Sequence, residues 1–104
     1  MVRNKENITE IVMKPFAECL CAIGKDWYHL QYEIKFNPGR YYPDYVTVNK
    51  FIMEHINGKE LNIEQAVEKI GEFLMDTYYP NALTVKGIVD SVTTHFPVEV
   101  IKEY

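Results

Sequence analysis

The residue best suited to nucleophilic chemistry is Cys21, in the segment Leu20-Cys21-Ala22-Ile23-Gly24-Lys25-Asp26. A cysteine becomes a strong nucleophile when its pKa is lowered and solvent reaches the thiolate. In this segment Lys25 is placed to favour the thiolate and Asp26 is placed to pass a proton. The alternative interpretation is structural, with Cys19 and Cys21 as small buried apolar residues, because unpaired cysteines are among the most buried residue types.

Two carboxylates stand at the starts of predicted helices. Asp44 precedes the first helix and Glu64 belongs to the first turn of the second. If the two helix N-termini pack side by side, both acids point into one cleft. There a carboxylate can accept two hydrogen bonds from the N–H edge of a purine or pterin ring. In the simpler alternative, Asp44 caps its helix and Glu64 interacts with the helix dipole. For Glu60 we expect a position on a surface loop.

Three histidines complete the set of reactive side chains. His29 falls on the polar face of a predicted strand, and His95 opens the last predicted strand as a candidate substrate ligand. His55 is expected on the inner side of the first helix, as a core or packing residue. Together with the cysteines they show no familiar zinc-ligand spacing, so we expect no metal. The chain also lacks a glycine-rich phosphate loop and a nucleophile elbow.

The elements that must position these residues begin with two strands. A weak strand is predicted over residues 7–13, ended by Lys14-Pro15. The clearest strand is Trp27–Phe36, in which apolar and polar residues alternate as a half-buried strand requires. Asn37-Pro38-Gly39 is a strong turn signal.

Two helices follow. The first is predicted from an N-cap at Asp44 to a stop at Asn57-Gly58, where the glycine suits a left-handed backbone. The second starts at Asn62, with Gln65 completing a capping box, and is broken at residues 79–81.

Two further strands close the chain. Residues 83–89 alternate, with a bulge expected at Gly87. Phe96, Val98 and Val100 alternate in the last strand, after a connecting turn over residues 90–94.

The order strand, strand, helix, helix, strand, strand predicts one α+β domain spanning residues 1–104. Strands on both sides of a helical pair indicate an antiparallel sheet with both helices on one face. Such a sheet has unpaired edge strands, and joining edges between subunits into a barrel removes them. We therefore expect a homo-oligomer, with the tyrosines Tyr41, Tyr42 and Tyr45 at a subunit contact.

Composition narrows the classes of partner. The net charge of -4 argues against nucleic acid as the main partner, because duplex binding needs a basic surface. The polar N-terminal stretch has no apolar region typical of a signal peptide, and no apolar run is long enough for a membrane helix. A Cys-x-Cys pair is poorly placed for an ordinary disulfide, so we expect a reducing cytoplasm.

The order of these motifs resembles a known family, the unimodular 7-cyano-7-deazaguanine (preQ0) reductases of queuosine biosynthesis and their archaeosine-forming relatives, which have the tunnelling fold. The similarity runs from about Phe16 to Val100. It is carried by Phe16 followed by Leu20-Cys21, by the spacing from Cys21 to Pro38, by Asp44 at the first helix start, and by the segments 58–64 and 83–87.

The resemblance implies a chemistry. In that family a cysteine adds to the substrate nitrile to give a covalent thioimide, an aspartate handles the proton, and two hydrides from NADPH give an aminomethyl group. Carried over, Cys21 is the nucleophile, Asp26 the proton donor, and Glu64 with Asp44 the acids that bind the base.

Two alternatives stay open. The family's Ser/Lys-rich helix start, which binds NADPH, is replaced here by Asp44-Tyr45-Val46-Thr47-Val48-Asn49-Lys50. The first alternative is therefore the amidine-forming reaction on preQ0-modified tRNA, which needs no NADPH. The second is a non-catalytic protein of the same fold that binds a purine or pterin, or only assembles.

Overall fold

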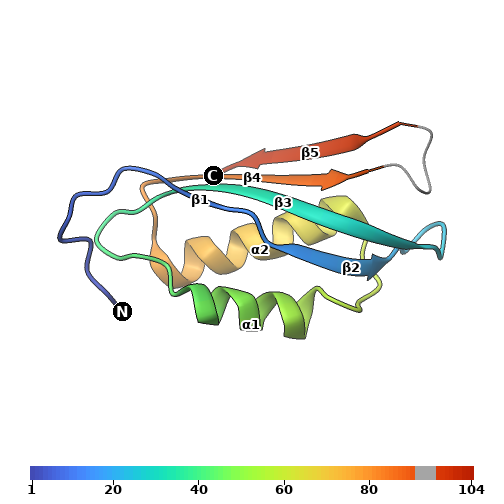
Figure 1. Ribbon diagram of the computed structural model, residues 1–104, viewed down its shortest axis with the longest axis horizontal. Helices are drawn as coiled ribbons and strands as arrows, with labels where there is room; N and C mark the ends of the chain where they lie inside the picture. The colour runs from blue at the N-terminus through green and yellow to red at the C-terminus, as the bar shows by residue number, and fades with distance from the viewer. Residues whose placement is uncertain (91–95) are drawn as a thin grey trace.

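Strands of one antiparallel sheet are covered on one face by two helices, as the computed structural model shows (Figure 1). The structure describes residues 1–90 and 96–104. The elements are β1 Ile11–Met13, β2 Phe16–Leu20, β3 Trp27–Asn37, α1 Tyr45–His55, α2 Ile63–Tyr78, β4 Ala82–Val89 and β5 Val98–Glu103. The predicted α+β class and the helix positions are confirmed.

The first predicted strand differs from the structure. β1 begins later than expected, and β2 continues the pairing beyond Pro15, so that both pieces lie antiparallel to β3. A proline has no N–H to donate, which is why a strand end was predicted here. Its carbonyl still accepts a hydrogen bond from the backbone N–H of Tyr32 at 2.8 Å, so the pairing with β3 resumes.

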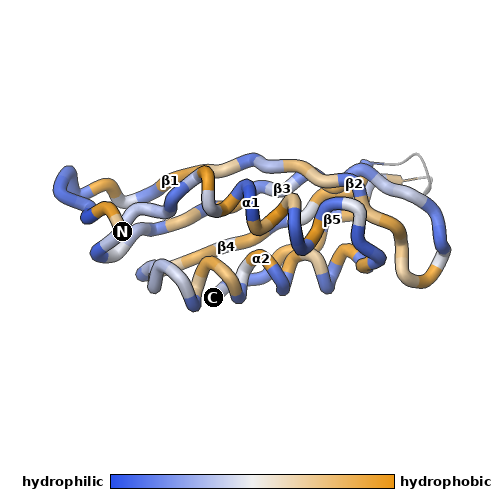
Figure 2. The backbone as a smooth tube through the Cα atoms, turned by 90° about the horizontal axis from the view of Figure 1, so that it is seen from below, coloured by the Kyte–Doolittle hydropathy of each residue, from blue (hydrophilic) through white to orange (hydrophobic). Residues whose placement is uncertain are grey.

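The inner face of β3 is the centre of the core, as the alternation predicts. Tyr28, Leu30, Tyr32, Ile34 and Phe36 are buried, and the residues between them face away from the helices. The apolar stripe of α2 packs against this face, and polar residues alternate with it along the helix (Figure 2).

The helix ends form as their sequences predict. The Asp44 side chain accepts hydrogen bonds from the backbone N–H groups of Val46 and Thr47. Asn62 and Gln65 form a reciprocal capping box. Gly58 has φ 76, in the left-handed region that only glycine adopts freely.

Gly87 corrects a prediction. It lies in a continuous register, opposite Tyr32 of β3 and Val100 of β5, and forms no bulge. A Cβ atom at this position would lie 2.7 Å from Cγ2 of Val67. The glycine is therefore needed for the close approach of α2 to β4.

The C-terminal strand begins later than expected. Phe96 precedes β5 and is 63% exposed. The predicted turn over residues 90–94 falls, after Asp90, outside the described residues, as does His95. In the described part of the chain no helix is long and apolar enough to cross a membrane.

Candidate active site

The loop of residues 21–26, called here the cysteine loop, joins β2 to β3 at one end of the molecule (Figure 1). Two backbone hydrogen bonds close it. The N–H of Cys21 donates to the carbonyl of Asp26 at 2.8 Å, and the N–H of Lys25 donates to the carbonyl of Cys21 at 2.9 Å. The backbone of Lys25 takes φ 61 to complete the turn. The loop therefore presents its first and last side chains close together.

The side chains of Cys21 and Asp26 both lie close to Gly24. The Cys21 sulfur accepts a hydrogen bond from the backbone N–H of Gly24 at 3.4 Å. A Cβ atom built on Gly24 would lie 3.9 Å from Sγ of Cys21 and 4.0 Å from Oδ2 of Asp26, so both atoms border one small open space. Cys21 is half-buried and Asp26 is exposed. This arrangement suits a thiol nucleophile with a carboxyl group at hand to exchange a proton.

Lys25 has a different partner from the one expected. Its ammonium group pairs with the carboxylate of Glu60. The prediction that Lys25 favours the Cys21 thiolate therefore finds no support in its contacts. Glu60 is exposed, as expected, and this ion pair links the cysteine loop to the connection between the two helices.

The segment of residues 57–61 between the helices, called here the interhelix segment, lies along the outer edge of β2. The N–H of Leu20 donates to the carbonyl of Lys59 at 3.0 Å, and the N–H of Leu61 donates to the carbonyl of Leu20 at 2.9 Å. The N–H of Gly58 also donates to the carbonyl of Glu18 at 2.7 Å. These bonds hold the start of α2 next to the cysteine loop.

Tyr28, near the start of β3, contacts the interhelix segment. Its buried hydroxyl donates a 2.6 Å hydrogen bond to the carbonyl of Leu61. Burial raises the pKa of Tyr28, Cys19 adds to the rise, and the charges of Cys21 and Glu64 add further. The Tyr28 phenol therefore stays neutral at physiological pH. Sequence reasoning placed Tyr28 in the core without a role.

Glu64 projects from the first turn of α2 and is exposed. Among the described residues, no group pairs with its carboxylate. An exposed carboxylate without a described partner is available to a ligand, and its position in the first turn also suits the helix dipole.

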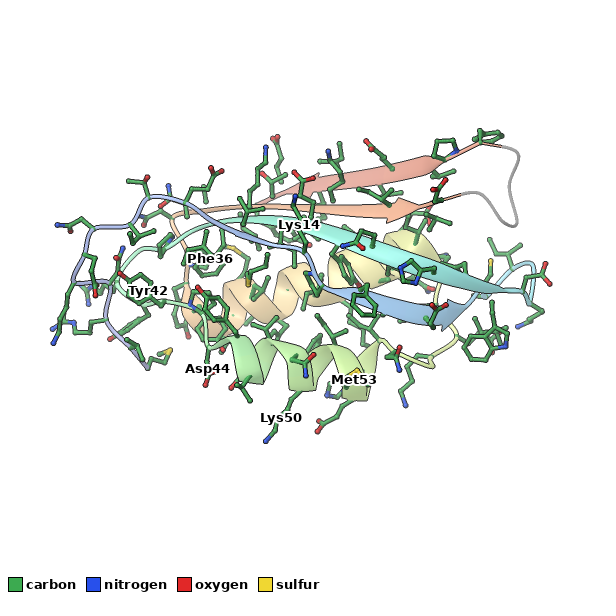
Figure 3. All side chains as sticks on the ribbon, in the orientation of Figure 1. Lys14, Phe36, Tyr42, Asp44, Lys50 and Met53 are labelled. Carbon is green, nitrogen blue, oxygen red and sulfur yellow. The ribbon has the colours of Figure 1, made fainter. Side chains whose placement is uncertain are left out.

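Asp44 is not brought to this site within one chain. α1 and α2 run in opposite directions, so their N-termini lie at opposite ends of the helical layer (Figures 1 and 3). The expectation that the two helix starts pack side by side is therefore wrong within a subunit. Hydrogen bonds from the Thr47 hydroxyl and backbone lower the pKa of Asp44, which is the behaviour of a helix cap. The Asp44 side chain borders a separate apolar cavity of about 1020 Å³, together with Tyr42 and Tyr45.

The other candidate ligands occupy separate places. His29 pairs with Glu18 at 2.7 Å on the outer face of the sheet. His55 is exposed and packs on the ring of Phe51, at 4.7 Å between centroids. His95 lies outside the described residues. In the described part of the chain no three histidine, cysteine or acidic side chains gather in a way that could hold a metal ion.

The two cysteines differ in environment. Cys19 is fully buried in the core, and its thiol donates to the carbonyl of Ile56 at 3.4 Å. Burial raises the pKa of the Cys19 thiol, the hydrogen bond with Tyr28 lowers it, and the nearby Glu18 raises it, with a net rise. The structural interpretation therefore holds for Cys19, while Cys21 stands at the boundary between core and solvent.

Comparison with known proteins finds similarity at the level of structure. No family model and no curated protein matches the sequence. Among solved structures, the chain is similar to the archaeosine synthase QueF-Like in the apo form, with a TM-score of 0.81, 18% identity, and coverage of 92% of this chain and 93% of that one. It is also similar to a putative dihydroneopterin aldolase (FolB) from Vibrio cholerae O1 biovar El Tor str. N16961, with a TM-score of 0.75, 17% identity, and coverage of 93% and 97%. Both are tunnelling-fold proteins, and this chain adopts the tunnelling fold.

Proposed function

We propose that the protein is a tunnelling-fold enzyme that forms a covalent thioimide between Cys21 and the nitrile of 7-cyano-7-deazaguanine, as in the queuosine pathway. The observation that supports this proposal is that the Cys21 sulfur and the Asp26 carboxylate both lie close to Gly24. The similarity to an archaeosine synthase of the same fold supports it.

The first proposed step is the addition of the Cys21 sulfur to the nitrile. The Cys21 thiolate attacks the nitrile carbon and forms a C–S bond, and one π pair of the nitrile moves to nitrogen. The carboxyl group of Asp26 delivers a proton to the developing nitrogen anion. Glu64 accepts hydrogen bonds from the N–H edge of the base, and Tyr28 holds Glu64's helix against the loop.

The second half of the reaction separates two candidates. Reduction needs hydride from NADPH, but the start of α1 does not fit its phosphates. The Asp44 carboxylate already occupies the N–H groups of Val46 and Thr47, and its negative charge repels phosphate. This favours the second candidate, in which ammonia attacks the thioimide carbon, the C–S bond breaks, and an amidine is released. A tRNA bearing the nitrile base is then the substrate.

A non-catalytic role is the contrasting proposal. A protein that only binds a purine or pterin needs Glu64 but not a reactive Cys21. The intact mass of the protein after mixing with 7-cyano-7-deazaguanine distinguishes the two. We expect one substrate mass added per chain in the wild type and in Cys19→Ala, and none in Cys21→Ala. No adduct in the wild type, with Cys21 inert to alkylating agents, overturns the covalent mechanism. If an adduct forms, adding NADPH or ammonium in turn identifies the product.

We also propose that the chain assembles through the edges of its sheet. The interhelix segment covers the edge of β2, which leaves β1 and β5 as the edges without a described partner strand. Unpaired edges favour pairing with another copy. Light scattering should give a mass of several chains, and a monomer at micromolar concentration contradicts this assembly.

A further inference from the structure

A second cavity lies away from the cysteine loop, between the N-terminal residues and the turn that follows β3. It has a volume of about 510 Å³. The residues that line it are Arg3, Asn4, Lys5, Asn7, Gly39 and Arg40. Three of these are permanent cations at neutral pH and none is acidic.

The backbone holds the cations together although they come from distant parts of the sequence. The N–H of Asn4 donates to the carbonyl of Arg40 at 2.7 Å, and Arg3 forms an antiparallel bridge with Tyr41. The Asn4 side chain accepts from the N–H of Ile8 and donates to its carbonyl, both at 3.0 Å. The N-terminal residues are therefore an ordered loop that carries Arg3 and Lys5 to Arg40.

The charges of this cavity are not compensated. Other lysines pair with acids, as Lys25 does with Glu60 and Lys86 with Glu99 at 3.9 Å. Within the described residues no carboxylate comes within ion-pair distance of Arg3, Lys5 or Arg40.

The acid that follows Lys5 in the sequence is turned elsewhere. Glu6 accepts a 2.6 Å hydrogen bond from the hydroxyl of Tyr42 and does not line the cavity. Like charges held close together repel, and an anion relieves that repulsion. The chain as a whole has a net charge of -4, so the positive charge of this cavity is opposite in sign to the charge of the whole chain.

We propose that this cavity binds the diphosphate group of a small molecule. The planar guanidinium groups of two arginines match the oxygens of a phosphate through paired hydrogen bonds, and the lysine adds a point charge. Three positive charges balance a diphosphate better than a single phosphate, which carries about -2 at neutral pH. A compact cavity on a protein of net charge -4 suits a small anion better than a nucleic-acid backbone, which needs a basic surface. This inference does not depend on the chemistry of Cys21.

The test is a calorimetric titration of the full chain with inorganic pyrophosphate and with ADP at low ionic strength. We expect saturable binding of one ligand per chain. Arg40→Gln and Arg3→Gln should each weaken it about fivefold, and the double variant should abolish it. Lys50→Gln makes the same change of charge on α1, outside the cavity, and should weaken binding less than twofold. All these side chains are exposed, so the variants should fold, which circular dichroism verifies.

Three results overturn the proposal. The first is the absence of saturable binding. The second is an equal loss in Lys50→Gln, which shows a general effect of charge. The third is binding of a single-stranded oligonucleotide at concentrations where neither pyrophosphate nor ADP binds, which assigns the cavity to a nucleic-acid backbone instead.

Discussion

The hydroxyl of Tyr28 donates a 2.6 Å hydrogen bond to the carbonyl of Leu61, the residue immediately before the N-cap of α2. This bond ties β3 to the start of the helix that carries Glu64. The neighbouring Tyr32 hydroxyl donates to the carbonyl of Ala66 at 2.9 Å in the same way. Two buried phenols thus fix the helix start against the sheet, and with it the position of Glu64 relative to Cys21.

Replacing Tyr28 by phenylalanine tests this positioning. The variant leaves the Leu61 carbonyl without its buried donor, which should lower the free energy of unfolding by about 1–3 kcal/mol in urea denaturation. The rate of adduct formation with 7-cyano-7-deazaguanine should fall as well. Tyr42→Phe is the matched control, since that exposed hydroxyl bonds only to the side chain of Glu6. An equal loss in both variants contradicts a specific role for Tyr28.

The two cysteines should react very differently with an alkylating agent. Cys19 is fully buried and burial raises its thiol pKa, so it should be labelled only after denaturation. Cys21 is half-buried beside the open space at Gly24 and should be labelled in the native protein. Mass spectrometry of the digested protein measures both sites. Labelling of Cys19 before Cys21 under native conditions would falsify this assignment.

Replacing Asp26 should slow the addition of Cys21 to the nitrile and leave the reactivity of the Cys21 thiol with an alkylating agent nearly unchanged. Asp26→Asn removes the proposed proton donor and should slow adduct formation by about a hundredfold or more. Alkylation of Cys21, which needs no proton donor, should change little. Glu60→Gln removes another carboxylate from the same loop region and serves as the control. If Glu60→Gln slows the adduct as strongly as Asp26→Asn, the effect is one of charge and Asp26 has no special role.

Asp44 should govern part of the stability at acid pH. Its pKa is lowered in the folded chain, chiefly by the Thr47 hydroxyl and backbone N–H. The contribution is therefore present above the unfolded pKa of about 3.9 and is lost as pH falls through the lower, folded pKa. Asp44→Asn keeps a capping acceptor but cannot titrate, so its Tm should fall less steeply below about pH 4 than that of the wild type. Identical slopes would show that Asp44 contributes nothing to the acid sensitivity.

Strong periodicity explains which elements the sequence predicts well. β3 buries five large apolar or aromatic residues in alternation, and α2 has a continuous apolar stripe. The predictions of both elements therefore agree with the structure. β2 is different because its small residues Ala17 and Cys19 face the core while Phe16 is 65% exposed. Because the small residues of β2 are buried and its large residue is exposed, the alternation of apolar and polar residues is hard to recognise in the sequence. Pro15 also suggests a strand end where the pairing with β3 in fact continues.

The candidate site was predictable in part. The closeness of Cys21 and Asp26 follows from a short loop between paired strands. The expectation that the helix starts with Asp44 and Glu64 lie side by side is wrong within one subunit. The short connection between the helices indicates antiparallel neighbours with their starts at opposite ends. The partner of Tyr28 is a backbone carbonyl, which leaves no signal in residue types. The hydroxyl of a buried tyrosine does require a hydrogen-bond partner, and this requirement is the one signal in the sequence that indicates a structural role for Tyr28.

Gly71 and Tyr104 offer a test of how the C-terminus is held. The Tyr104 N–H donates to the carbonyl of Leu83 at 2.8 Å, and its ring lies over α2 at Gly71. A Cβ atom on Gly71 would lie 2.2 Å from the Tyr104 hydroxyl oxygen, so Gly71→Ala must displace the ring. In the wild type this substitution should therefore be destabilising or neutral, although alanine favours a helix.

In a Tyr104→Ala background the obstacle is gone, and Gly71→Ala should raise the free energy of unfolding by about 1 kcal/mol through helix propensity alone. Urea denaturation of the four proteins in this double-mutant cycle gives the coupling between the two positions. The same gain from Gly71→Ala in both backgrounds would mean that Tyr104 does not pack on α2 in solution. A change of sign between backgrounds would establish that the absence of a side chain at position 71 allows the Tyr104 ring to cover the helix.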